Sequence, residues 1–394
     1  FVLCYNGEIY NFHELKTELK SAGHDVSFKG HSDTEVLLEC FSNLGVIKTL
    51  QLIKGMFAIA LWDNKERTMT LIRDHVGKKP LYYGIVDGAL VFASELKAIR
   101  SFSGSFMINR AAAKLYKYFG FIPAPHSIYE GVYKLPPAHI LTVSPAELQS
   151  KRSLPESAEF WRLAKCTSVQ SSKSLEQILS GAVQSRMISD VPLGAFLSGG
   201  IDSSLVAALM QANSDKSIKT YSIGFSDHKF DESRFAEKIA AHIGTDHKTY
   251  HVDETQTRDI IPELPEIYDE PFADYSQIPT AILCQVAAKD TTVALSGDGG
   301  DEGFCGYRRY FMLKKLMDRS SSIPRPLTKI LAGILKALPE SAYNSLSLNG
   351  KRLHTVASIL ESKSLPEAIL KTLSVDHKSA TPDLYKYYDR KGLT

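Results

Sequence analysis

A run of small and polar residues, SGGIDSS at 198–204, is the part of this 394-residue chain best suited to chemistry. It follows the apolar run Val191–Leu197, which we expect to be a buried strand, and it leads into an expected helix at Ser203–Gln211. Glycines let backbone N–H groups surround an anion, and a helix N-terminus adds a positive field. The run lacks the lysine and the spacing of the GxxxxGK[ST] loop. It therefore predicts a phosphate loop of another kind, with a plain glycine-rich turn as the alternative.

A second run of the same character, SGDGGDE at 296–302, also follows a β-branched apolar stretch, Thr291–Leu295. Ligands in open α/β sheets bind at the carboxyl ends of the strands, and carboxylate and hydroxyl oxygens suit a metal ion. This run therefore predicts a metal and nucleotide site, with a solvated acidic loop as the alternative.

The two runs together resemble the synthetase domain of glutamine-dependent asparagine synthases, and the first run resembles the pyrophosphate loop of ATP pyrophosphatases. The N-terminal part independently resembles a class II glutamine amidotransferase domain. That resemblance rests on motifs in a fixed order: NGEIYN at 6–11, HSDTE at 31–35, GMFA at 55–58, RDHVGKKPLYY at 73–83, FASELKA at 92–98 and KLPPAH at 134–139. The resemblance covers about residues 1–310.

The resemblance implies an ATP site and two Mg²⁺ ligands in the second half of the chain. Asp202 cannot bind phosphate directly because like charges repel, so we expect it to hold Mg²⁺, with a helix N-cap as the alternative. Asp301 matches the second metal carboxylate of the family. The expected ATP contacts are Leu197, Ser198, Gly199, Gly200, Asp202, Ser203, Ser204, Ile223, Ser296 and Gly297.

Asp298 stands where many relatives carry glutamate, and we expect it to act as a catalytic acid or base. A carboxylate there would take a proton from the attacking ammonium. The nearby segment Glu270–Ser276 lies beside the acceptor carboxylate in the family, and a simple turn and helix cap is the alternative interpretation.

For glutamine hydrolysis, the side-chain amide of Asn6 and the backbone N–H of Gly7 would stabilise the tetrahedral oxyanion. Glu8 and Asp33 match family residues that bind the α-amino group of glutamine and its surroundings. The alternative for Asn6-Gly7 is a hairpin turn.

The family's nucleophile is an N-terminal cysteine, whereas this chain begins with Phe1. We expect Cys4 to be a small core residue, because the family's thiol uses its own α-amine as base. The chain is therefore expected to be a fragment at both ends, with a glutaminase half that is not functional as given.

Short β-rich runs fill residues 1–145, and strands alternate with helices from Leu175 onward. The predicted fold class is an incomplete α+β amino-terminal-nucleophile hydrolase sandwich followed by an α/β Rossmann-like parallel-sheet ATP pyrophosphatase domain, itself incomplete at its C-terminus. We expect an amidotransferase domain at 1–145, a linker at 146–171 and an ATP-binding domain at 172–394.

Composition excludes several function classes. With 46 basic and 44 acidic residues, the net charge of +2 gives no electrostatic case for nucleic acid or membrane surfaces. No apolar run approaches the roughly 20 residues that span a bilayer. Five scattered cysteines fit neither a metal site nor a disulfide framework, so we expect the reducing cytoplasm.

The sequence thus predicts an enzyme that converts aspartate, glutamine and ATP to asparagine, glutamate, AMP and pyrophosphate through an acyl-adenylate. ATP and Mg²⁺ are the expected cofactors, and glutamine, aspartate and ATP the expected partners; a homodimer is left open. Two alternatives are a related amidotransferase acting on a sugar acid, a peptide or a β-amino acid, and a non-catalytic relative.

Overall fold

The computed structural model describes residues 1–151, 154–163, 171–225, 231–337, 350–362 and 364–373. The chain divides into two compact units. The first contains residues 1–112, 123–270 and 275–296, and the second contains 113–122, 271–274 and 297–394. Within the first unit we call residues 1–112 and 123–163 the antiparallel region, and 171–270 and 275–296 the parallel-sheet region.

Two antiparallel sheets form the antiparallel region. The larger has the order β1-β2-β3-β7-β8, with strands β1 (Val2–Ile9), β2 (Gly55–Asp63), β3 (Thr68–Arg73), β7 (His139–Val143) and β8 (Ala158–Glu159). The smaller has the order β5-β4-β6, with strands β4 (Tyr82–Val86), β5 (Ala89–Ala93) and β6 (Val132–Lys134).

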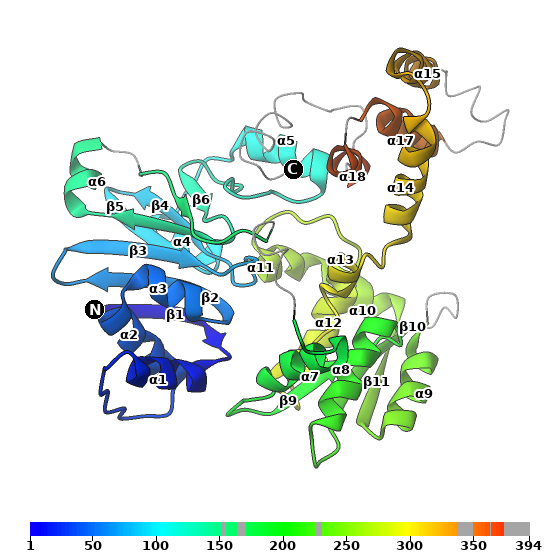
Figure 1. Ribbon diagram of the computed structural model, residues 1–394. Helices are drawn as coiled ribbons and strands as arrows, with labels where there is room; N and C mark the ends of the chain where they lie inside the picture. The colour runs from blue at the N-terminus through cyan, green and yellow to red at the C-terminus, as the bar shows by residue number, and fades with distance from the viewer. Residues whose placement is uncertain (152–153, 164–170, 226–230, 338–349, 363, 374–394) are drawn as a thin grey trace. The chain divides into compact units, whose positions relative to one another are not determined.

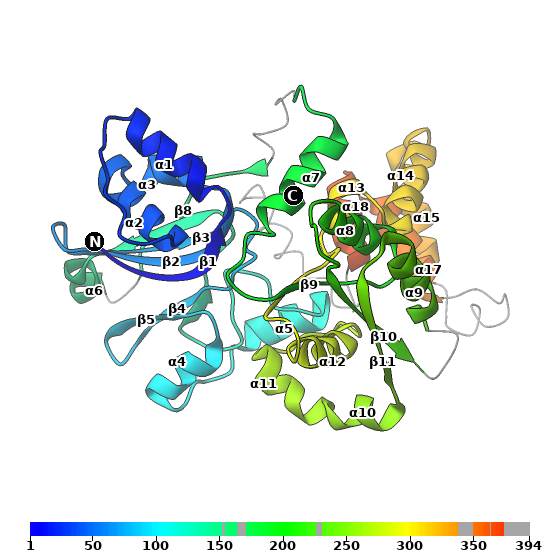
Figure 2. The same cartoon turned by 90° about the horizontal axis from the view of Figure 1, so that it is seen from below.

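Strand β2 shows why the sheets are layered. Side chains alternate between the two faces of a strand. Phe57, Ile59 and Leu61 pack in a core with helices α1 (Phe12–Ser21), α2 (Asp33–Leu44) and α3 (Val46–Leu52). Ala58 and Ala60 instead pack in a second core with side chains of the smaller sheet. Figure 2 shows the helices on one side of the larger sheet and the smaller sheet on the other. The predicted α+β sandwich of the N-terminal part is confirmed in its broad outline.

Regular structure extends into the span that we predicted to be a linker. Helix α6 (Pro145–Lys151) follows β7, and β8 pairs with β7 through His139–Glu159 and Ile140–Ala158. Helices α4 (Leu96–Ser103) and α5 (Arg110–Phe119) precede this part of the chain. The predicted domain boundaries stay a prediction.

The parallel-sheet region contains one sheet, β11-β10-β9-β12, in which every neighbouring pair is parallel (Figure 1). Its strands are β9 (Leu193–Phe196), β10 (Lys219–Phe225), β11 (Asp246–Val252) and β12 (Val293–Leu295). Helices alternate with them: α7 (Leu175–Ser185), α8 (Ile201–Ala212), α9 (Ser233–Ile243) and α12 (Gln277–Ala287). The predicted alternation is confirmed, although β9 is shorter than the Val191–Leu197 strand that we expected.

Short helices connect β11 to α12: α10 (Glu254–Asp259), the 3₁₀ turn η2 (Ile261–Glu263) and α11 (Leu264–Tyr268). The second unit is helical where it is described, with α13 (Gly300–Phe304), α14 (Arg308–Ser321), α15 (Arg325–Ala337), α17 (Gly350–Glu361) and α18 (Leu365–Leu373). Leu313, Ile359 and Ala368 form its core. In the described part of the chain, the helices are all too short or too polar to cross a bilayer.

Candidate functional site

Strand β1 carries Asn6, Gly7 and Glu8 within a continuous ladder to β2, so the hairpin-turn alternative for Asn6-Gly7 is wrong. Glycine is required at position 7 by close packing. A Cβ atom there would lie 2.1 Å from the main-chain oxygen of Met56 and 2.7 Å from the Cα of Phe57.

The amide of Gly7 faces the open edge of β1. Tyr10 donates its N–H to the oxygen of Lys54 across the β1–β2 ladder, whereas Ile9 donates its N–H to Asp33 Oδ2 at 2.8 Å. Alternate amides of a strand point the same way, so Gly7 and Ile9 share the edge away from β2. In the described sheet β1 has only β2 as a strand neighbour. The Gly7 N–H is thus placed where an oxyanion could accept it.

Asp33 and Glu8 bring two carboxylates to this edge. Asp33, at the start of α2, also accepts a hydrogen bond from Tyr5 Oη at 2.9 Å. Burial and, secondly, the charge of Asp33 raise the pKa of Glu8, while Lys79 lowers it. Asn6 donates from Nδ2 to Ser94 Oγ at 2.9 Å. Carboxylates held close together favour a bound cation, which fits the α-amino group of an amino acid.

The RDHVGKK motif forms a scaffold on the β3 side of β2, where β3 ends, and the sequence did not reveal this role. The Asp74 side chain is fully buried, and the Arg73 guanidinium is largely buried; burial lowers the pKa of Arg73. The Asp74 carboxylate accepts main-chain N–H groups from Phe57 (3.3 Å), Val76 (3.1 Å), Lys78 (2.9 Å) and Lys79 (2.8 Å). Arg73 donates to the main-chain oxygens of Gly77, Lys79 and Leu135. The sequence signal that could have indicated this scaffold is the Arg73-Asp74 pair next to a glycine-containing turn.

Cys4 is exposed, so the expectation of a small core residue is wrong. Leu3 and Tyr5, like Ile9, are β1 residues whose side chains belong to the core beneath the helices. Because alternate side chains of a strand point to opposite faces, Cys4 lies on the other face.

The glycine-rich loop at 198–200 joins β9 to α8. Leu197 is buried and donates its N–H to the oxygen of Tyr221 at 2.8 Å. Gly199 has φ +83°, and a Cβ atom there would lie 2.8 Å from the Cβ of Phe235, so both conformation and space require glycine. Gly200 is the N-cap of α8 and supplies no side-chain cap. The first-turn N–H groups of α8 therefore lack intrahelical and capping partners, as a phosphate site requires.

The serines of the loop hold its shape. Ser203 Oγ lies 2.9 Å from Ser198 Oγ and accepts the N–H of Ser198 at 3.2 Å. Ser204 Oγ donates to the oxygen of Gly200 at 2.6 Å. Asp202 is the second residue of α8, so the N-cap alternative for it is wrong. Its half-buried carboxylate is available to a hard cation such as Mg²⁺, which prefers oxygen ligands.

The second loop begins at a neighbouring strand end. Strand β12 pairs in parallel with β9, so Ser296 and Leu197 leave adjacent strands at the same edge of the sheet. Ile223 lies within β10, the other neighbour of β9. Leu197, Ile223 and Ser296, which all belong to the first unit, therefore lie on neighbouring strands or at their ends, as the expected strand-end site requires.

The remainder of the second loop, from Gly297, belongs to the second unit. Asp301 lies in the first turn of α13, and Gly306 donates its N–H to the main-chain oxygen of Asp301 at 2.9 Å. Tyr307 Oη donates to Glu302 Oε1 at 2.7 Å and lowers the pKa of that carboxyl. In the described part of the chain, no three His, Cys, Asp or Glu side chains lie together as a metal site. The pairing of Asp202 with Asp301, and the role of Asp298, stay predictions.

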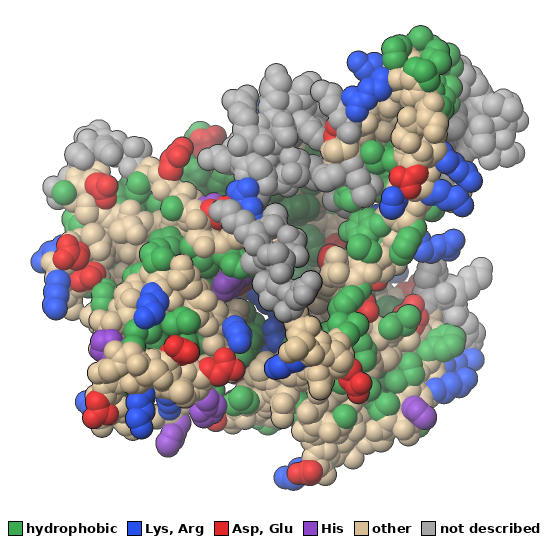
Figure 3. Space-filling view, viewed as in Figure 1, with side chains coloured by type: hydrophobic (Ala, Val, Ile, Leu, Met, Phe, Trp, Pro, Cys, Tyr) green, Lys and Arg blue, Asp and Glu red, His purple; other side chains and the backbone are tan. Residues whose placement is uncertain are grey.

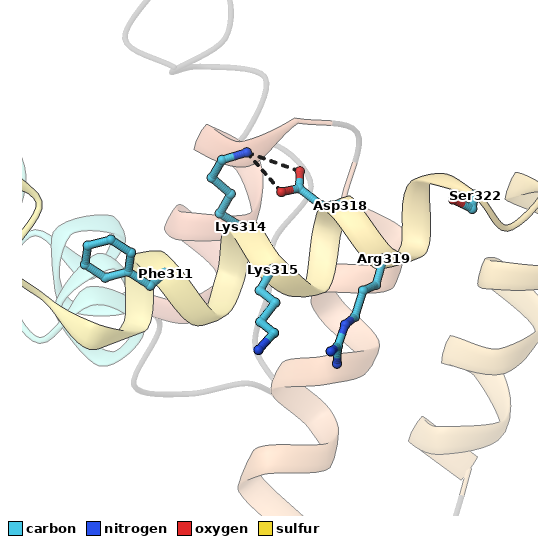
Figure 4. Close-up of a pocket in the computed structure, with 6 residues that line it drawn as sticks. All are labelled: Phe311, Lys314, Lys315, Asp318, Arg319 and Ser322. Atoms are coloured by element: carbon cyan, nitrogen blue, oxygen red, sulfur yellow. Dashed lines mark hydrogen bonds and ion pairs between the residues drawn. The ribbon is translucent and has the colours of Figure 1, made fainter.

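Two cavities in the described part of the chain are lined by residues other than the predicted site residues. A cavity of about 560 Å³ lies along α14 and is lined by Phe311, Lys314, Lys315, Asp318, Arg319 and Ser322 (Figure 4). Lys314 and Asp318 form an ion pair at 3.0 Å in it. Basic and acidic side chains are interspersed on the face shown in Figure 3. The strand-end loops and the open edge of β1 therefore remain the candidate sites.

Comparisons with known proteins identify the families that the two parts of the chain match. Residues 174–385 match the family model for asparagine synthase, and residues 1–154 match the model for a glutamine amidotransferase domain. The chain is 35% identical over 384 residues to a putative asparagine synthetase (glutamine-hydrolyzing) 2 of Methanocaldococcus jannaschii, covering 93% of this chain and 72% of the relative.

A second relative, asparagine synthetase (glutamine-hydrolyzing) 1 of Bacillus subtilis, is 33% identical, and the match covers 86% of this chain and 52% of the relative. The chain thus spans about half the length of that relative. Among solved structures, a glutamine phosphoribosylpyrophosphate amidotransferase of B. subtilis aligns with 63% of this chain and 45% of its own, at 17% identity and a TM-score of 0.28.

Proposed function

We propose that this chain, which belongs to the asparagine synthase family, takes part in ATP-driven transfer of glutamine nitrogen to the side-chain carboxylate of aspartate. The observation that carries the proposal is the loop at 198–200: a glycine with φ +83°, next to an uncapped helix start, at the carboxyl end of a parallel strand. Such a loop suits phosphate, and the family's reaction uses ATP.

In this proposal the first-turn amides of α8 bind the departing pyrophosphate, while an aspartate oxygen attacks the α-phosphorus. The bond to the β-phosphate breaks, and an acyl-adenylate forms. Asp202 and Asp301 would hold Mg²⁺, which would neutralise charge on the phosphates. Asp298 would take a proton from the nitrogen nucleophile as the amide forms and AMP leaves.

The antiparallel region would bind glutamine at the open edge of β1. Gly7 N–H and Asn6 Nδ2 would stabilise the oxyanion, and Glu8 and Asp33 would bind the α-amino group. The layered sheets would then be the amino-terminal-nucleophile hydrolase fold that the resemblance implies. The cysteine usage favours a reducing compartment, so the cytoplasm stays the predicted location, and a homodimer stays open.

Aspartate is the proposed acceptor because the two relatives reported above are described as asparagine synthetases. A sugar acid, a peptide or a β-amino acid would use the same activation chemistry. Product analysis separates these acceptors. The full-length gene product should be incubated with MgATP, ammonia and each candidate acid, followed by mass spectrometry of the amide and measurement of AMP and pyrophosphate.

We expect asparagine, AMP and pyrophosphate in equal amounts, and only with aspartate. An amide formed only from another acid would replace the acceptor. Absence of pyrophosphate release with every acid would favour the non-catalytic alternative.

Cys4 is not the proposed glutaminase nucleophile, because an internal strand residue has no free α-amine to act as its base. Glutamate release should therefore be the same in the parent and in Cys4→Ala. Loss of glutaminase activity in that variant would show that the nucleophile is misplaced.

A further inference from the structure

Two consecutive acids, Asp269 and Glu270, follow α11 and precede Pro271. Both belong to the parallel-sheet region by sequence, yet their carboxylates contact residues of the antiparallel region. Glu270 is the first residue of the segment Glu270–Ser276, which the family resemblance implies lies beside the acceptor carboxylate. No role was predicted for Asp269 or for these contacts.

Glu270 is held by three groups. Its Oε1 accepts the N–H of Ile128 at 2.8 Å, and its Oε2 forms an ion pair with Lys134 Nζ. Tyr82 Oη lies 3.5 Å from the same Oε2. The side chains of Glu270 and Lys134 are only 8% and 15% exposed. A buried carboxylate persists when a cation and hydrogen-bond donors compensate its lost hydration.

The pKa values agree with a buried, mutually dependent set of groups. Burial lowers the pKa of Lys134, and Glu270 opposes that change. Burial also raises the pKa of Tyr82, and the negative charge of Glu270 adds to the increase. Removing the charge of Glu270 would leave Lys134 as a buried cation without its main partner.

Asp269 is fixed by a second, separate set of contacts. Its backbone has φ +60°, which is uncommon for a residue other than glycine. Its Oδ2 accepts the N–H of Lys97 at 3.4 Å, and its Oδ1 lies 3.7 Å from Lys97 Nζ. Strained backbone of this kind persists only where surrounding contacts hold it, and it is concentrated at functional sites.

The C-terminal end of the segment 269–276 is also fixed by a hydrogen bond. Tyr268 Oη donates to the main-chain oxygen of Gln277, the first residue of α12, at 2.7 Å. Residues 269–276 are thus a loop closed at its base, and one of its ends is held by the antiparallel region. Residues 271–274 of this loop belong to the second unit, in which Ala273 donates its N–H to the oxygen of Gly120 at 2.7 Å. Within the loop Tyr275 is 94% exposed, so its side chain is available to a ligand.

We infer that Glu270 is a positioning residue through which Lys134, Ile128 and Tyr82 hold the loop 271–276 in the conformation that receives the acceptor. The identity of the acceptor rests on the proposed function; the control of the loop by Glu270 does not. A plain structural brace between two regions is the competing explanation.

The test compares Glu270→Gln with the parent in ammonia-dependent synthesis by the full-length gene product. The amide keeps the shape of the side chain and an acceptor for Ile128, but it removes the charge that Lys134 requires. We expect the KM for the acceptor to rise about tenfold, with kcat at saturating acceptor and the Kd for ATP each changing less than about threefold. Lys134→Met should give the same pattern, and the double variant should be no worse than the worse single variant, because the two residues act as one pair.

Glu266→Gln is the matched control. Glu266 lies in α11, four residues before Glu270, and its side chain is exposed; the bond that it accepts from Lys97 uses its main-chain oxygen. An unchanged acceptor KM in Glu270→Gln, or an equal increase in Glu266→Gln, would overturn the inference. A parallel loss of ATP affinity would show a structural brace instead.

Hydrogen exchange of the amides at 272–276 is a readout that does not need activity. We expect faster exchange in this loop in Glu270→Gln, with unchanged exchange in the loop at 198–200. If the parent makes no amide from aspartate but the loop still loses protection, the proposed acceptor fails and the role of Glu270 stands. Unchanged exchange in the loop would overturn the role of Glu270 whatever the acceptor is.

Discussion

The antiparallel region and the parallel-sheet region position their candidate groups by different means. In the antiparallel region, carboxylates hold the main chain. The half-buried Asp33 binds the amide of Ile9 at the edge of β1, and the buried Asp74 binds one amide of β2 and three amides of the turn after β3. At the end of β9, glycine conformation and helix position present the main chain instead, and a contact between Ser198 and Ser203 holds the shape of the loop.

The two regions therefore contain aspartates with different roles, one that supports folding and one that is available to ligands. Asp74 is fully buried and satisfied by the protein, so its loss would affect folding. Asp202 is half-buried in the first turn of α8, so its loss would affect ligands and leave folding nearly unchanged.

The largest effect should follow removal of either proposed metal carboxylate. Asp202→Asn and Asp301→Asn should each lower pyrophosphate release by at least about 10²-fold, because charge on the phosphates would lose its compensation. The assay is pyrophosphate release with MgATP, ammonia and aspartate. Thermal unfolding of Asp202→Asn should match the parent.

Asp215→Asn is the control for Asp202. Asp215 is exposed in the turn after α8, and its removal changes the net charge equally. Its activity should equal that of the parent. Parent activity in both Asp202→Asn and Asp301→Asn would contradict the metal assignment.

Asp298 should affect amide formation without affecting ATP binding. Asp298→Asn should lower ammonia-dependent synthesis by about 10²–10⁴-fold, the usual cost of losing a proton-transfer group. Asp298→Glu should retain activity, since glutamate is common at this position in the family. Calorimetry with ATP supplies the contrast: weaker ATP binding in Asp298→Asn would place this acid with the metal ligands instead.

Asp74 should affect stability. Asp74→Ala would leave buried amides without acceptors and should lower the free energy of unfolding by about 3 kcal/mol. Urea denaturation of the parent, Asp74→Ala and Asp202→Asn measures the contrast directly. Equal stabilities in all three proteins would show that the two regions do not differ as described.

Sequence patterns predicted most of the elements, because apolar alternation and turn residues act locally. The strands that lead into the two glycine-rich loops were found within a few residues of their observed bounds. The start of α8 was missed by two residues because Ile201 is an exposed apolar residue at a helix start. That shift is what excludes the N-cap alternative for Asp202.

The long-range contacts could not be predicted from the sequence. The pairing of Glu270 with Lys134 joins residues far apart in the chain, and neither residue lies in a pattern that identifies its partner. Exposure of Cys4 was missed for a related reason: alternation in β1 fixes which residues share a face, and only the packing shows which face is buried.

The smallest effect concerns pH and a histidine of the parallel-sheet region. His247 Nδ1 lies 2.8 Å from Thr220 Oγ1, and Nε2 lies 3.1 Å from Ser222 Oγ. Burial lowers the pKa of His247, and Glu237 opposes the change. In the unfolded chain His247 has its ordinary pKa of about 6.5, so as the pH falls below that value the unfolded chain binds more protons than the folded chain. The stability that the neutral, buried His247 contributes is therefore lost as the pH falls.

His247→Gln should make the decrease in stability between pH 7.5 and pH 5 shallower, as measured by thermal unfolding across that range. His75 and His126 have lowered pKa values too, and their contribution should remain in both proteins. A parallel pH profile in the variant and the parent would contradict the role of His247.

The central claim is that the strand-end loops activate the aspartate side-chain carboxylate with ATP. Aspartate labelled with ¹⁸O in that carboxylate tests it directly, in a reaction with MgATP and ammonia followed by mass spectrometry of the nucleotide. Because the carboxylate oxygen bonds to the α-phosphorus and stays there when the amide forms, we predict one ¹⁸O atom in each AMP. Unlabelled AMP, or ADP with the label in inorganic phosphate, would contradict the account.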